Sequence, residues 1–175
     1  MKKLISFMAI FAAMAMTMAF VSCGGDDDDT DSAANRLAFA NKLTQNGLSC
    51  TWEGLSMQQR KEMGSWNDER QMYAVMRFDR TATSETQGTG ILLFFENSYK
   101  ESFIEGSEFT WTFSDDMLRL SYRRGGWKAQ YAEYRTSELV INGNTFNGTL
   151  FESTDFKYRF NFTKSTFTDW AKYIN

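Results

Sequence analysis

Apolar side chains recur at every second position in one segment after another of this 175-residue chain. In residues 109–113 aromatic residues alternate with threonines, and in residues 156–162 they alternate with Lys157, Arg159 and Asn161. Because successive side chains of a β-strand point to opposite faces, a period of two predicts strands with one apolar and one polar face. The repetition of this pattern predicts an all-β domain.

Eight or nine segments show this alternation or a short apolar run. They are residues 48–53, 72–79, 91–95, 109–113, 118–123, a segment around Tyr131, 139–141, 145–151 and 156–162. No helical crossover separates them, which argues against parallel pairing. Asn142-Gly143 is the strongest hairpin signal, whereas residues 57–70 are expected to form a loop or short helix and residues 81–89 a polar turn.

These observations predict an antiparallel up-and-down meander, which at this size closes into a barrel or folds into a sandwich. We favour the barrel because closure removes exposed aromatic strand edges. A short helix is expected before it, since Ser32 can cap a helix over about 33–45 and Gly47 follows its end. A last helical turn is expected over 168–174. The surface loops would then include residues 57–70 and 80–88.

The first 23 residues have the pattern of an export signal. Lys2 and Lys3 precede an apolar stretch from residue 4 to 21, which ends in Ser22-Cys23 and two glycines. This ending resembles the lipobox of bacterial lipoproteins, and the resemblance implies that Cys23 receives a diacylglycerol and becomes the membrane-anchored N-terminus. The alternative is a transmembrane anchor, for which the stretch is of borderline length. Residues 1–22 are therefore assigned to the signal.

An acidic run, Asp26–Asp29 with Asp31, follows the cysteine. Self-repulsion would keep this segment extended as a tether, so residues 23–32 are assigned to a lipidated acidic tether. The cysteine, the glycines and the acidic run together resemble the start of many Bacteroidetes lipoproteins. That resemblance implies an outer-membrane lipoprotein exposed at the cell surface.

Composition narrows the classes of function. The chain has 19 basic and 22 acidic residues, and 17 of each lie from Ser32 onward, so the folded part has no net charge. This balance argues against nucleic-acid binding, which calls for a basic face. The chain contains no histidine, the commonest metal ligand and general base near neutral pH. With Cys23 acylated, Cys50 is the single free thiol. We therefore expect no catalytic residue, metal or cofactor, and a protein that is not an enzyme.

A tryptophan on the first predicted strand, in Cys50-Thr51-Trp52-Glu53-Gly54, precedes the meander. This arrangement resembles the lipocalin-like (calycin) barrels, small domains that Bacteroidetes lipoproteins often carry. The family motif is Gly-x-Trp, and Cys50 stands where glycine is usual. The resemblance implies that Trp52 packs under the barrel against an arginine of a late strand, for which Arg159 is the candidate. The resemblance covers about residues 48–163. We therefore assign residues 33–47 to a helical segment and residues 48–175 to the barrel domain.

The aromatic faces predict what the barrel interior contains. An eight-stranded barrel is just wide enough either to be filled by its own side chains or to hold one small ligand. We expect binding of a small hydrophobic or aromatic molecule, with a filled barrel acting through surface loops as the alternative. The expected interior residues are Trp52, Met76, Phe78, Phe109, Trp111, Phe113, Leu120, Tyr122, Tyr131, Tyr158, Phe160 and Phe162.

Overall fold

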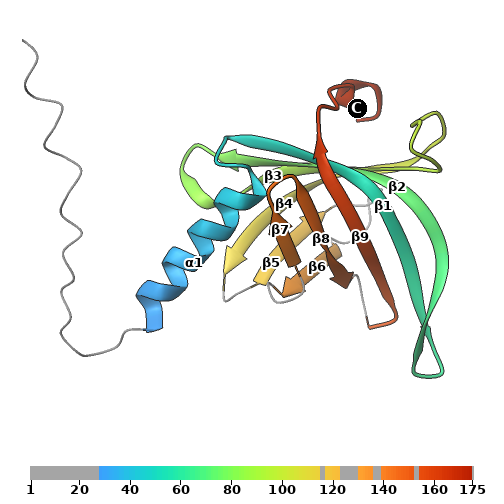
Figure 1. Ribbon diagram of the computed structural model, residues 1–175, viewed down its shortest axis with the longest axis horizontal. Coiled ribbons are helices and arrows are strands. Elements are labelled where there is room, and N and C mark those ends of the chain that lie inside the picture. Colours follow the sequence, from blue (N-terminus) through green and yellow to red (C-terminus); the bar gives the residue numbers. More distant parts are fainter. Residues whose placement is uncertain (1–27, 115–116, 123–129, 136–138, 152–153, 175) are drawn as a thin grey trace, which may run out of the picture.

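The computed structural model describes residues 28–114, 117–122, 130–135, 139–151 and 154–174 (Figure 1). One helix, α1 (Asp28–Leu43), precedes nine strands. The strands are β1 (Ser49–Glu62), β2 (Ser65–Thr81), β3 (Ser84–Phe95), β4 (Phe103–Ser114), β5 (Met117–Tyr122), β6 (Gln130–Arg135), β7 (Leu139–Asn142), β8 (Thr145–Phe151) and β9 (Phe156–Ser165). A single helical turn, η2 (Trp170–Lys172), lies near the C-terminus as expected.

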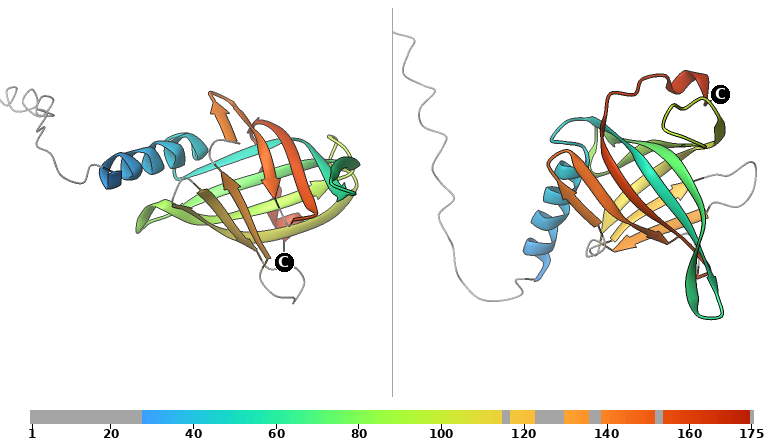
Figure 2. Two further views of the ribbon diagram at one scale, coloured as in Figure 1. Left: turned by 90° about the horizontal axis from the view of Figure 1, so that it is seen from below. Right: turned by 45° about the vertical axis from the view of Figure 1, so that its right-hand side comes forward.

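The strands form one curled antiparallel sheet. Its order is β6-β5-β4-β3-β2-β1-β9-β8-β7, and a further pairing between Glu133 and Phe151 joins the edge strand β6 to β8, next to the opposite edge. β7 pairs with the first part of β8 in the hairpin predicted at Asn142-Gly143, where Gly143 has a φ of +54°. The prediction of an all-β, antiparallel meander that curls into a barrel after a short helix is therefore confirmed (Figure 2).

The prediction of a loop or helix over residues 57–70 is wrong. β1 and β2 continue through it as one long hairpin, which turns at Met63 and Gly64 with φ values of +49° and +85°. This hairpin projects from the end of the barrel opposite α1, so solvent reaches both of its faces and polar residues are tolerated on each (Figures 1 and 2). The expected turn over 81–89 is also too long, because β3 already begins at Ser84.

The C-terminal half of α1 closes one end of the barrel. Ala40 and Leu43 are fully buried in the interior cluster, and the ring of Phe39 stacks on Phe113 at 4.7 Å. Polar contacts fix the same junction, since Arg80 Nη2 donates to Asn41 Oδ1 over 2.6 Å. This helix therefore belongs to the core of the domain.

The C-terminal segment covers part of the outer face of the sheet. Val75, Leu93 and Phe95 point outward from β2 and β3 and pack in a second cluster with Trp170 and Phe167. Phe95 and Phe167 have their ring centroids 6.5 Å apart. The apolar run 91–95 is thus explained, because one face of β3 meets the barrel interior and the other meets the C-terminal segment.

Candidate functional site

The residues predicted to face the barrel interior lie together in one cluster. Those that are buried in it, each at most 7% exposed, are Trp52, Met76, Phe78, Phe109, Trp111, Phe113, Leu120, Tyr158 and Phe162. Phe160 is partly buried and packs against them. The period of two therefore identified a shared face correctly, while the ligand-binding role of these residues stays a prediction.

Two predicted interior residues, Tyr122 and Tyr131, have side chains outside the described part of the structure. Their backbones are placed by the strand register, in which Tyr122 lies opposite Phe109 and Tyr131 lies opposite Ser121. The prediction made for Cys23 also falls outside the described residues.

Close ring contacts fill the barrel at the end that α1 closes. Phe78 is fully buried and makes edge contacts with Phe109, Trp111 and Phe146 at centroid distances of 5.4, 6.2 and 6.2 Å. Phe146 in turn contacts Trp52 at 5.5 Å. A side chain that lined an empty space large enough for water would keep accessible surface there, and these retain almost none. The described aromatic residues therefore form a packed core at this end.

The predicted pair of Trp52 and Arg159 is wrong. Arg159 lies opposite Met57 on the outer face of β9, where its guanidinium pairs with Asp68 at 3.4 Å. The alternation of β9 explains the error, because Tyr158 and Phe160 take the inward positions on either side of Arg159. Sequence periodicity alone already placed Arg159 in the polar series.

Trp52 instead connects the first strand to α1. Its indole Nε1 donates a 2.9 Å hydrogen bond to the backbone carbonyl of Leu43, the last residue of α1, and its ring packs on Phe146. This bond satisfies a helix-terminal carbonyl that would otherwise be buried without a donor. Sequence reasoning missed both Phe146 and the contact with Leu43, since neither is close to Trp52 in a recognisable motif.

Replacing Trp52 with phenylalanine should remove this bond and leave a small void. We expect the free energy of unfolding to fall by about 1–3 kcal/mol, the usual cost of leaving a buried polar group unsatisfied. Urea denaturation followed by circular dichroism measures the change. Thr51→Ser, a half-buried neighbour whose side chain points the other way, is the control, and an equal loss in both variants would contradict the role given to the bond.

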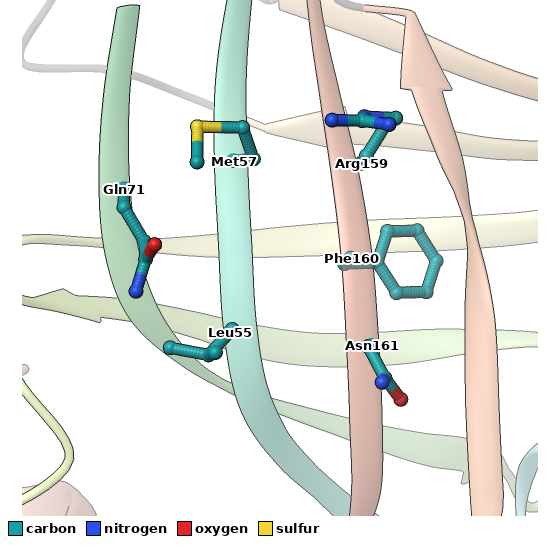
Figure 3. A pocket seen from close by; sticks show the side chains of 6 residues that line it. All are labelled: Leu55, Met57, Gln71, Arg159, Phe160 and Asn161. Atoms are coloured by element: carbon teal, nitrogen blue, oxygen red, sulfur yellow. The ribbon is translucent and has the colours of Figure 1, made fainter. Parts of the chain in front are cut away.

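A shallow groove of about 260 Å³ lies over the outer face of β1, β2 and β9 (Figure 3). Its lining residues are Leu55, Met57, Gln71, Arg159 and Asn161, together with Phe160, whose ring packs on the interior side of β9. Leu55 is 52% exposed, although it is a large aliphatic residue in the middle of a strand. This groove was missed from the sequence, because the predicted strand ended at residue 53 and Met57 was assigned to a loop.

Charged and amide groups surround this apolar floor. Arg159 and Asp68 are about half exposed, at 56% and 52%, and Gln59 Nε2 donates to the same carboxylate oxygen of Asp68 that Arg159 contacts. The Asp68 carboxylate therefore holds Arg159 at one side of the groove, and Gln71 and Asn161 supply side-chain amides elsewhere along its rim. The arrangement offers apolar contact together with hydrogen-bond donors and acceptors, and it places no nucleophile beside a base.

The other chemically reactive groups are positioned as structural residues. Cys50 is 5% exposed in the interior, and burial raises the pKa of its thiol, so this side chain packs as a small hydrophobic residue. Within the described ranges, no three cysteine, aspartate or glutamate side chains lie close enough together to hold a metal ion. No helix in the same ranges is long and apolar enough to cross a membrane.

Comparisons with protein-family models, with curated proteins and with solved structures find no match for this chain.

Proposed function

We propose that this protein is a lipid-anchored, non-enzymatic interaction module of the bacterial outer membrane, displayed at the cell surface. In this proposal a lipocalin-like barrel has a packed interior, and the groove on its outer face binds a side chain of a partner protein. The observation that carries it is the contrast between the buried aromatic interior and the groove, where Leu55 is exposed and Met57 is half-buried.

The size of the groove supports a protein side chain over a free small molecule. Pockets for drug-sized ligands are about 300–1,000 Å³ and bury most of the ligand. The groove measures about 260 Å³ and is shallow, so it suits one side chain of a larger surface. The half-exposed Leu55 gives the apolar contact, and Arg159 with the flanking amides gives the polar rim that interfaces usually have.

The position of the helix supports the lipocalin likeness and the proposed display. Trp52 lies at the barrel end that α1 closes, as the family motif implies, although the arginine of that motif has no counterpart at Arg159. α1 begins at Asp28, before the expected cap Ser32 and inside the segment first assigned to the tether, so the tether of this proposal ends before Asp28. The long β1–β2 hairpin lies at the other end of the barrel, so it would point away from the anchor (Figure 2).

Substitution of Leu55 by aspartate tests the groove. Chemical cross-linking on intact host cells should give a defined partner adduct with the wild type, and we expect Leu55→Asp to lose at least about 80% of it, because a charge replaces the central apolar contact of a small interface. Val140→Asp is the matched control, since Val140 is 57% exposed on β7, outside the groove. Equal adduct yields from wild type and Leu55→Asp would overturn the proposal.

Native mass spectrometry separates this function from ligand binding inside the barrel. We expect protein purified from its own host to show the mass of the acylated chain alone. A small-molecule adduct that survives Leu55→Asp would instead support a ligand in the interior and contradict the packed-barrel proposal.

A further inference from the structure

The loop between β3 and β4, residues 96–102, is held by one side chain. Its residues are exposed except for Lys100, whose side chain is 22% exposed. Lys100 also has a φ of +60°, in the left-handed region that residues with a Cβ seldom adopt. The loop therefore adopts a disfavoured backbone conformation while this one lysine is turned inward.

The ammonium group of Lys100 lies among a carboxylate and two aromatic rings. Its Nζ is 3.0 Å from Glu53 Oε2, and it lies 5.2 Å from the ring centroid of Tyr73 and 5.7 Å from that of Phe167. Rings within about 6 Å attract a cation through their negative faces. Glu53, Tyr73 and Phe167, hereafter the ammonium cage, thus have the composition that proteins use to bind alkylammonium groups.

Elements other than the loop hold the ammonium cage in place. Glu53 lies in β1 between its neighbours β2 and β9, and Tyr73 lies in β2. Phe167 is fixed by ring contacts with Trp170 at 4.9 Å and with Phe95 at 6.5 Å. If Lys100 moved out with its loop, the carboxylate and both rings would stay where they are and would face solvent.

The ammonium cage adjoins the groove. Tyr73 is the direct cross-strand neighbour of Leu55, and Glu53 precedes Leu55 by two positions on the same outer face of β1. A partner with an apolar side chain over Leu55 could therefore place a second side chain of the same strand at the cage. Glu53 and the two rings specify that this second group is cationic.

We propose that the ammonium cage binds the alkylammonium group of a partner's lysine, and that Lys100 fills this site as an internal ligand until the 96–102 loop opens. This inference rests on the proposed function of the groove and adds the chemical class of the group next to it. Competition from a tethered lysine explains how the site stays closed in the free protein, because a short tether gives an effective concentration of about millimolar or more.

Titration with n-butylammonium, followed by ¹H–¹⁵N NMR, tests the ammonium cage. We expect Lys100→Gly, which empties the cage and removes the cost of the positive φ, to saturate with a dissociation constant at least about tenfold below that of the wild type. Adding Glu53→Gln to this variant should weaken binding at least about tenfold. The neutral analogue 1-butanol should shift none of the cage resonances.

A second probe distinguishes the sources of the ammonium group. Nα-acetyl-lysine methylamide should bind Lys100→Gly with an affinity similar to that of n-butylammonium. Binding of n-butylammonium without the lysine amide would overturn the assignment to a protein lysine. The proposed ammonium cage would be wrong if Lys100→Gly saturates with neither probe. It would also be wrong if adding Glu53→Gln leaves the affinity of Lys100→Gly for n-butylammonium unchanged.

Two controls keep the test interpretable. If Lys100→Gly does not fold, Lys100→Asn also removes the ammonium group and shortens the side chain while tolerating the positive φ, and absence of saturation in that variant would count against the cage. Leu55→Asp in the Lys100→Gly background should still bind n-butylammonium. If the ammonium cage binds neither probe but Leu55→Asp still loses the partner adduct, the proposed function of the groove is retained.

Discussion

Replacement of Cys23 by alanine should abolish incorporation of radiolabelled palmitate into this protein. The lipobox resemblance implies that Cys23 is the acylated residue, because the diacylglycerol is attached to a cysteine sulfur. Cys50→Ala is the matched control, because Cys50 is the only other cysteine and is buried in the barrel. Label that persists in Cys23→Ala would show that the anchor has been assigned to the wrong residue.

The same anchor predicts where the folded domain is found. Each buried methylene group of an acyl chain contributes about 0.8 kcal/mol, and two chains hold a protein stably on a membrane. A variant in which residues 24–175 are exported behind a cleavable signal without the lipobox cysteine lacks the proposed anchor. Compared with the wild type, it should therefore move almost completely from the membrane pellet to the soluble fraction. Retention in the pellet after a wash in high salt would contradict a purely lipid anchor.

Truncation of Phe78 to alanine should be the most destabilising change in the barrel interior. Phe78 is fully buried and meets three other rings, so its removal leaves a cavity that its rigid neighbours fill poorly. We expect the free energy of unfolding to fall by about 3–5 kcal/mol, a large part of the 5–15 kcal/mol typical of a domain. The midpoint of thermal unfolding should fall by about 10 °C for a domain of this size.

Two comparison variants show whether burial causes this loss. Phe78→Leu keeps most of the volume and should lose less than half as much. Val140→Ala removes an aliphatic side chain that is 57% exposed, and should change the free energy of unfolding by less than about 1 kcal/mol. A barrel that held a large hydrated cavity beside Phe78 would instead tolerate Phe78→Ala nearly as well as Val140→Ala.

Periodicity in the sequence was sufficient for the strand faces. Trp52, Phe78, Trp111 and Phe162 were assigned to one interior face, and they are buried together. It failed in the β1–β2 hairpin, because a strand outside the barrel has no buried face and hence no alternation to detect. Arg159 shows a different error, in which a family motif was applied to a residue that its own strand alternation places outside.

The groove and the ammonium cage were beyond prediction from the sequence. Met57 lies opposite Arg159 only because β9 returns to pair with β1, more than 100 residues later in the chain. Lys100 meets Glu53 and Phe167 only because a loop and the C-terminal segment fold over the same outer face. Sites of this kind depend on contacts between distant residues, and single-sequence patterns describe neighbours in the chain.

The sequence by itself determined the antiparallel all-β architecture and the sides of its strands, because side-chain alternation is a local property of the backbone. It also supplied the prediction of a lipid anchor at Cys23. Only the tertiary structure decided that aromatic rings fill the α1 end of the barrel, that Trp52 bonds to Leu43, and that Lys100 occupies a cage of its own protein. Those outcomes depend on strand register and on packing between segments far apart in the chain, which a pattern of period two leaves open.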